Sequence, residues 1–255
     1  MLPPLSWTLV ASLLCMCCTE AFASGEMASR RVPRGWQAGG IALVSNGGYA
    51  GSSSRQLVVP AVAYEGERVF LRGLQLGWHA WQRDDWRLDL VAQARLDGFD
   101  AEDIPLDGLR DRRGSMDVGA VLTRSSRQGN LELTVLSDAL SRSRGQELAL
   151  QYGYPLRVGK WRLTPSLGVR WWSHRLADYY YGIRPAEVAN GAPGPYAVPA
   201  VLVPEAGFNA AVPLGRRWMF WSALKYQHLP GAITDSPLVQ RSSASTVLVG
   251  VVYSF

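Results

Sequence analysis

The last ten residues of the chain alternate between two kinds of side chain. Val247, Val249, Val251, Tyr253 and Phe255 hold every second position, and smaller or more polar residues lie between them. A period of two residues predicts a β-strand, because successive side chains of a strand point to opposite faces of the sheet. A terminal strand that ends on an aromatic residue is typical of bacterial outer-membrane barrels, in which it closes the sheet against the first strand. The alternative is the last strand of a secreted β-sandwich.

The same alternation runs through residues 86–96 and 161–171. In the second stretch Trp161 and Trp171 lie ten residues apart on the apolar face. This matches a strand that crosses the hydrocarbon with an aromatic side chain at each interface. Two further strands are predicted in the same way, at residues 147–154 and 218–226. The polar faces of the first two stretches carry the arginines that we expect to point into a barrel lumen: Arg87, Arg95, Arg162 and Arg170.

Short and long connections alternate along the chain from residue 82 onward. The short polar links are residues 82–85, 125–129, 155–160 and 213–217. The long links, rich in Gly, Pro and charge, are residues 97–113, 139–144, 174–199 and 229–243. Outer-membrane barrels have short periplasmic turns and longer outer loops, so this alternation predicts a barrel whose last strand ends at the periplasmic side.

The number of strands depends on the front of the chain. Residues 35–44 and 56–64 predict two strands joined by an outer loop at residues 45–55. Residues 69–81 must then supply two crossings, and a split near Arg72 gives about 12 strands in an even-numbered barrel. If residues 35–44 do not cross the membrane, the barrel has about 10 strands. We predict an all-β, transmembrane, antiparallel, up-and-down β-barrel and prefer the larger number.

The beginning of the chain predicts a secretory signal peptide. An apolar run from Trp7, too short to span a bilayer, precedes the small residues Ala21 and Ala23, a pattern typical of a cleavage site. The predicted parts are a signal peptide at residues 1–23, a short lead-in at residues 24–34 and an outer-membrane barrel at residues 35–255. The cysteines all lie in the removed part: Cys15, Cys17 and Cys18. The exported chain therefore has no disulfide and no thiolate metal site.

Charge and candidate chemistry add little to this picture. The net charge of +5 comes from scattered bases, whereas nucleic-acid binding requires a clustered basic face. His174 follows Ser173 directly, and neighbours on a strand point to opposite faces, so the pair predicts no catalytic dyad. The remaining histidines are His79 and His228, and the acidic cluster of one loop is Asp97, Asp100, Glu102, Asp103 and Asp107. That cluster lacks the spacing of a calcium loop. We expect no catalytic residues, no metal site and no cofactor.

Several stretches are more specific than an alternating pattern requires. They are, in chain order, Tyr-Ala-Gly-Ser at residues 49–52, residues 69–77, Asp-Tyr-Tyr-Tyr-Gly-Ile at residues 178–183, Ile-Thr-Asp-Ser-Pro-Leu-Val at residues 233–239, and residues 250–255. In this order they resemble the MltA-interacting protein/OmpV family of outer-membrane proteins, over essentially the whole chain after the signal peptide.

The resemblance implies a non-catalytic barrel in the outer membrane of a Gram-negative bacterium, in contact with outer-membrane lipid and lipopolysaccharide. One proposed role in the family is a scaffold between a lytic transglycosylase and a murein synthase. Other members of the family are described as porin-like proteins or as adhesive surface antigens. We expect a scaffold that docks such periplasmic enzymes through its basic turns, at Arg157, Lys160, Arg216 and Arg217. The alternatives are that these bases lie near lipid phosphates, or that the protein is a narrow channel for anionic solutes or a surface adhesin.

Overall fold

A computed structural model describes residues 34–51 and 55–255 of the chain. The predicted signal peptide, and the lead-in up to residue 33, lie outside the described residues.

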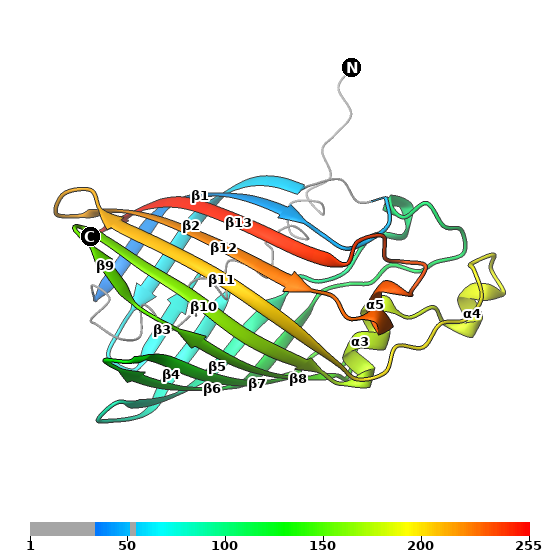
Figure 1. Ribbon diagram of the computed structural model, residues 1–255, viewed down its shortest axis with the longest axis horizontal. Coiled ribbons are helices and arrows are strands. Elements are labelled where there is room, and N and C mark those ends of the chain that lie inside the picture. Colours follow the sequence, from blue (N-terminus) through cyan, green and yellow to red (C-terminus); the bar gives the residue numbers. More distant parts are fainter. Residues whose placement is uncertain (1–33, 52–54) are drawn as a thin grey trace, which may run out of the picture.

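The described residues form one antiparallel β-barrel, in which the last strand pairs with the first (Figure 1). The strands are β1 (Gly35–Asn46), β2 (Arg55–Glu65), β3 (Val69–Arg72), β4 (Gln75–Arg83), β5 (Trp86–Arg95), β6 (Ser115–Ser126), β7 (Gly129–Asp138), β8 (Gln146–Gly153), β9 (Leu156–Val158), β10 (Trp161–Trp172), β11 (Val201–Pro213), β12 (Trp218–His228) and β13 (Ser243–Ser254). β8 and β9 are two parts of one crossing, because both pair with β10 and only Tyr154 and Pro155 separate them. The barrel therefore has 12 crossings, which confirms the predicted architecture.

The division of residues 69–81 is also confirmed. β3 ends at Arg72, and a turn at residues 73–74 leads into β4. Gly73 has φ +59°, a left-handed conformation that glycine adopts without steric cost. The short link predicted at residues 155–160 was wrong in extent, because residues 156–158 pair with β10. Pro155 lacks an N–H group and interrupts the strand at the point where the sequence suggested a turn.

The seam between the first and last strands is built for close approach. β1 and β13 pair from Gln37 opposite Ser254 to Asn46 opposite Ser245. A Cβ atom on Gly39 would lie 2.0 Å from the carbonyl oxygen of Val251, so only glycine fits there. The terminal strand therefore closes the barrel, as its alternation predicted.

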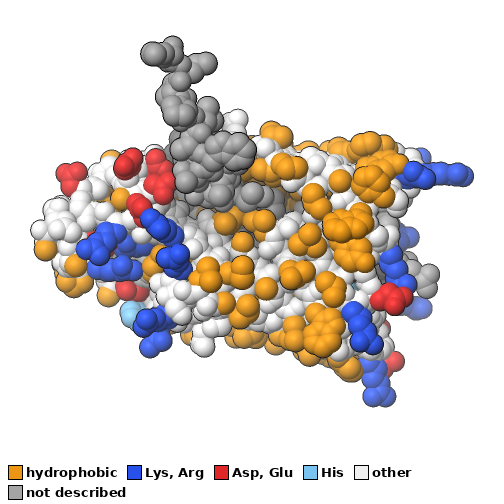
Figure 2. Space-filling view, turned by 180° about the vertical axis from the view of Figure 1, so that it is seen from behind, with side chains coloured by type: hydrophobic (Ala, Val, Ile, Leu, Met, Phe, Trp, Pro, Cys, Tyr) orange, Lys and Arg blue, Asp and Glu red, His pale blue; other side chains and the backbone are white. Residues whose placement is uncertain are grey.

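The two faces of the wall differ as expected for a membrane barrel. Val247 and Val249 are each 41% exposed on the outer face, whereas Leu248 between them is 1% exposed. Figure 2 shows apolar side chains spread over the barrel wall, and Lys and Arg side chains at both ends of it. An apolar outer face is what a strand presents to lipid, with its alternate residues directed into the lumen.

The long connections all lie at one end of the barrel and carry short helices (Figure 1). These are η1 (Ala101–Asp103), α3 (His174–Tyr181), α4 (Pro185–Val188) and α5 (Gly231–Thr234). The sequence predicted irregular loops here. α3 forms because Leu176, Ala177 and Tyr180 fall on one helical face, which is buried. Within the described part of the chain, the helices are too short and too polar to cross a membrane. The short turns, the start of β1 and the end of β13 lie at the opposite end, which we identify as periplasmic.

Candidate functional site

The outer loops pack into a cap with its own hydrophobic core. We use the name cap for residues 47–51, 96–114, 173–200 and 229–242. The buried apolar side chains of its core, some of which come from the adjoining strand ends, are Phe99, Ile104, Trp172, Leu176, Ala177, Tyr180, Ile183, Ala192, Val198, Val201, Val203, Leu229, Ile233, Leu238 and Val239. Burial of this kind contributes roughly 1.5–3 kcal/mol for each large side chain, so the cap is a packed structure that covers the outer end of the lumen.

Three of the stretches that carry the family resemblance meet in this cap. The backbone N–H of Ala50 donates a hydrogen bond to the carbonyl of Leu238 at 2.8 Å. The hydroxyl of Ser236 donates to the carbonyl of Tyr181 at 2.6 Å. The ring of Tyr49 stacks on that of Tyr181, with their centroids 5.3 Å apart. Burial raises the pKa of both phenols, so they stay protonated and act as neutral packing groups.

A buried ion pair joins two loops of the cap. The side chains of Arg112 and Glu187 are both 0% exposed, and Nη1 of Arg112 lies 2.7 Å from Oε1 of Glu187. Arg112 also donates to the carbonyl of Gly182 at 3.1 Å. Glu187 accepts further hydrogen bonds from the backbone N–H groups of Arg110 at 3.0 Å and Arg184 at 2.8 Å. Each oxygen of the carboxylate is thus satisfied, which a buried charge requires.

The pairing makes the cap sensitive to acid. Burial alone would raise the pKa of Glu187, but the hydrogen bonds from Arg112, Arg184 and Arg110 outweigh burial and lower the pKa to about 2. A lowered pKa in the folded state stabilises the cap fully above the ordinary value of 4.5, and this contribution is lost as the pH falls towards 2. We expect the protection factors of the cap amides, which correct for the intrinsic pH dependence of exchange, to be constant above that value and to fall below it.

The comparison that isolates this carboxylate is Glu187→Gln, which has no charge to titrate. The difference in the protection factors of the cap amides between the native protein and Glu187→Gln should shrink as the pH falls. A difference that stays constant down to the acid limit would contradict the assignment of the acid sensitivity to Glu187.

Below the cap, charged side chains cross the lumen in a network that we call the belt. The belt comprises Arg95 from β5, Asp117 from β6, Glu147 from β8, Arg170 from β10, Glu205 from β11 and Lys225 from β12. Nη2 of Arg95 lies 2.8 Å from Oε2 of Glu147, and Nε of Arg95 donates to Asp117 at 2.6 Å. Arg170 pairs with the other oxygen of Glu147 and, at 3.3 Å, with Glu205. The indole of Trp172 donates to Glu147 at 3.1 Å, so this carboxylate is the centre of the belt.

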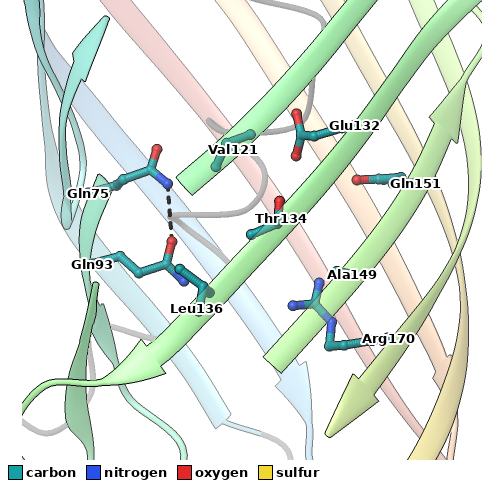
Figure 3. A pocket seen from close by; sticks show the side chains of 9 residues that line it. All are labelled: Gln75, Gln93, Val121, Glu132, Thr134, Leu136, Ala149, Gln151 and Arg170. Carbon is teal, nitrogen blue, oxygen red and sulfur yellow. Dashed lines mark hydrogen bonds between the residues drawn. The ribbon is translucent and has the colours of Figure 1, made fainter. Parts of the chain in front are cut away.

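A small cavity with both polar and apolar lining lies beside the belt (Figure 3). Its volume is about 30 Å³, which is the space of one or a few water molecules. Figure 3 shows Gln75 and Gln93 joined by a hydrogen bond on one side, and Gln151 and Arg170 on the other. The cavity is lined by Gln75, Gln93, Val121, Glu132, Thr134, Leu136, Ala149, Gln151 and Arg170.

A second polar cluster lies in the lumen on β2–β5. His79 stands between two carboxylates, 2.6 Å from Asp89 and 3.3 Å from Glu65. Arg87 donates to Asp89 at 2.9 Å, and Arg72 donates to Glu65 at 3.0 Å. His79, for which no role was predicted, thus belongs to an ion-pair network. His174 lies in the cap instead, where its Nδ1 atom is 2.7 Å from the carbonyl oxygen of Val198.

The four arginines predicted to face the lumen do so, and three are neutralised there. Arg87, Arg95 and Arg170 form ion pairs with carboxylates on the lumen side. Arg162 is half-buried and lies 3.6 Å from the sulfur of Met219. The local charge that would select anions is therefore largely compensated by Asp89, Asp117, Glu147 and Glu205.

The predicted docking residues lie at the periplasmic end and are exposed. Arg157 and Lys160 belong to the β9–β10 hairpin, and Arg216 and Arg217 precede β12. Arg217 donates to the phenol of Tyr253 at 2.7 Å, which ties this turn to the terminal strand.

The acidic loop does not gather into a metal site. Asp97 pairs with Arg95 at 3.1 Å, and Asp103 lies in η1. Among residues 34–51 and 55–255, no group of three or more His, Cys, Asp or Glu side chains is arranged to hold a metal ion.

Comparison with known proteins places the chain in a family. The profile of the family described as MltA-interacting protein MipA matches residues 38–255. The chain is similar to the Escherichia coli protein YiaT, 28% identical over 210 residues, which is 81% of this chain and 85% of YiaT. It is similar to the Escherichia coli MltA-interacting protein, 28% identical over 200 residues, 77% of this chain and 81% of that protein. The outer membrane protein Omp26La of Vibrio anguillarum is 24% identical over 148 residues, 58% of this chain and 57% of its own length.

Proposed function

Because the chain is an outer-membrane β-barrel that belongs to the MltA-interacting protein MipA family, we propose that it is a scaffold that docks a periplasmic peptidoglycan-remodelling enzyme. One relative, the Escherichia coli MltA-interacting protein, is named for an interaction with MltA. We extend this kind of partner, a murein hydrolase or synthase, to the present chain.

The observation that carries the proposal is a basic arc on three neighbouring periplasmic turns. The arc consists of the exposed side chains of Arg124, Arg127, Arg157, Lys160, Arg216 and Arg217. The turns at residues 124–130, 154–161 and 213–218 contain no acidic residue, whereas those at residues 65–69 and 83–86 do. The three turns follow one another around the barrel, because they join β6 to β7, β9 to β10 and β11 to β12. A one-sided positive surface favours an acidic partner and speeds its association.

The outer half of the barrel supports the same conclusion. The cap covers the outer end of the lumen, and the belt joins side chains from six strands on the lumen side through ion pairs. A channel for anions requires unpaired positive charge along an open path, as in the alternative that the sequence left open. The paired arginines favour a scaffold over that alternative.

Photo-crosslinking in living cells tests the proposal. A photoreactive residue replaces Arg157 or Arg216, and the control position is Arg142, an exposed base in the outer loop at residues 139–145. We expect adducts with a murein hydrolase or synthase from the two periplasmic positions and none from Arg142. Charge reversal by Arg157→Glu in the Arg216 probe strain should lower the yield several-fold, since an exposed ion pair contributes up to about 1 kcal/mol.

The main alternative is contact with the phosphates of anionic lipids in the inner leaflet. Adducts restricted to lipid at both positions would overturn the scaffold proposal. Equal capture of the same enzyme from Arg142 would also count against it, because that loop lies at the other end of the barrel.

A further inference from the structure

The barrel wall is incomplete beside β3. β3 has four residues and pairs with residues 63–65 of β2 only. The turn that follows it is held by two hydrogen bonds, from Gly73 N–H to the carbonyl of Val62 and from Ala94 N–H to the carbonyl of Leu74, both at 3.2 Å. Among the residues that the structure describes, residues 56–61 of β2 have a strand partner on the β1 side alone.

This unpaired edge lies at mid-height in the wall. Val58 is in register with Ala42 of β1, which is in register with Val249 near the middle of β13. Val58 is 79% exposed, against 41% for Val249, which has a strand on either side. Val58 is the more exposed of the two, and residues 56–61 have no described strand on the β3 side. An unpaired edge at this depth is unusual, because hydrocarbon offers no partner for backbone polar groups.

The sequence of β2 is suited to an open edge. Pro60 has no N–H group, and proline within a sheet is confined to edge strands and bulges. Pro60 therefore removes one of the donors that an unpaired edge would otherwise leave without a partner. β2 presents Val58 and Val62 to the outside, and Leu57 and Val59 to the lumen, where both are half-buried.

The inner side of this gap is apolar next to β2 and polar next to the β3–β4 hairpin. Val59 packs against a lumen-facing apolar cluster that includes Ile41, Leu43 and Leu248. On the hairpin side, Gln75 donates to Gln93 at 3.1 Å, and both line the cavity of Figure 3. The unpaired edge thus lies between the lipid-facing wall and a lumen of mixed polarity, below a cap that covers the axial exit.

We propose that the gap beside β3 is a lateral portal, through which the acyl chain of an outer-membrane amphiphile reaches the lumen face of β2. The occupant follows from the position, because the gap opens on the apolar wall and acyl chains surround that wall in the membrane. An acyl chain gains free energy against Leu57 and Val59, while the polar head finds hydrogen-bonding groups at Gln75 and Gln93.

Photolabelling of the native sequence tests the proposal without mutation. The barrel is reconstituted in phosphatidylethanolamine and phosphatidylglycerol vesicles that contain a phospholipid with a diazirine on its acyl chain, and adducts are mapped by mass spectrometry. We expect adducts on the lumen-facing Leu57 and Val59 as well as on Val58. The internal control is β6, which has strands on both sides, so Val118 on its outer face is labelled and Val121 on its lumen face is not.

A variant separates a portal from general leakage of the probe. Val59→Asn should lower labelling of Leu57 several-fold, since the acyl chain loses its apolar contact with the half-buried Val59. The matched change Val121→Asn should leave the labelling of Leu57 unaltered. Heat-modifiable migration on gels verifies that both variants are folded. A diazirine fatty acid used in parallel distinguishes a free amphiphile from a bilayer phospholipid as the source of the chain. Labelling of Leu57 and Val59 no greater than that of Val121, or labelling of Leu57 that is insensitive to Val59→Asn, would overturn the proposal.

Discussion

The Glu147→Ala variant is expected to unfold at lower temperature and to conduct anions. Glu147 is 2% exposed and receives hydrogen bonds from Arg95, Arg170 and Trp172. Its removal leaves two buried guanidinium groups without their shared carboxylate. Breaking one buried ion pair in this way costs about 3–5 kcal/mol, and water that enters to solvate the arginines opens the belt.

The measurements are the temperature of conversion on heat-modifiable gels and the conductance of single barrels in planar bilayers. Glu132→Ala is the matched control, because it removes the same group from a lumen-facing position of β7 that lies outside the belt. The native protein and this control should show little conductance. An open native barrel, or a Glu147→Ala barrel that remains closed and as stable as the control, would show that the belt does not seal the lumen.

The Glu187→Ala variant is expected to loosen the cap while the barrel stays folded. Arg112 would be left fully buried without its carboxylate, at a cost of about 3–5 kcal/mol. Hydrogen exchange should therefore accelerate at least about a hundredfold at the amides of Ala177 and Gly182 in and after α3. Amides in β13 should exchange as in the native protein, because the cap and the strand ladder are separate hydrogen-bonded units.

Two companion variants make this test specific. Glu102→Ala removes an exposed carboxylate from the same cap and should change exchange little. The double variant Arg112→Met with Glu187→Leu removes both buried charges and should recover much of the loss, since apolar replacement of a buried pair is often neutral. Equal acceleration in the single and double variants would mean that packing, and not the uncompensated charge, is responsible.

The alternation of side chains was enough to predict the wall of the barrel. It assigned Arg87 and Arg95 to the lumen, and the division of residues 69–81 followed from the need for an even number of crossings. These features are local, because one strand determines which of its own faces is apolar. Only Pro155 misled this reading, since proline in a short polar stretch suggests a turn more often than an interrupted strand.

The cap and the belt could not be predicted in the same way, because their partners are far apart in the chain. Arg112 and Glu187 are separated by 75 residues, and Arg95 and Glu147 by 52. The pattern could show that Glu147 faces the lumen, but its pairing depends on the relative register of four strands. The packing of Tyr49 on Tyr181 likewise depends on two loops meeting above the barrel. The motifs behind the family resemblance marked these loops but gave no contact between them.

The structure assigns different tasks to the two ends of the molecule. Three of the stretches that resemble the family lie in the cap, whereas the basic arc of the proposed docking surface lies at the opposite, periplasmic end. A variant such as Glu187→Ala should therefore leave enzyme capture at Arg157 intact. The proposed portal is independent of the cap and of the basic arc, since it depends on the length of the β3–β4 hairpin.

The seam between β1 and β13 has a consequence for the order of assembly. All other neighbours in the barrel are hairpins or nearby strands, which can form as soon as their own residues are available. The seam alone joins the two ends of the barrel sequence, with Gln37 opposite Ser254, so the entropy of closing the longest loop falls on this single step. Until that step, β1 and β13 are both open edges that can pair with foreign strands. The glycines that allow the two backbones to approach so closely remove a steric barrier to this last pairing step. The barrel can therefore close only when the residues of β13 are available to pair with β1.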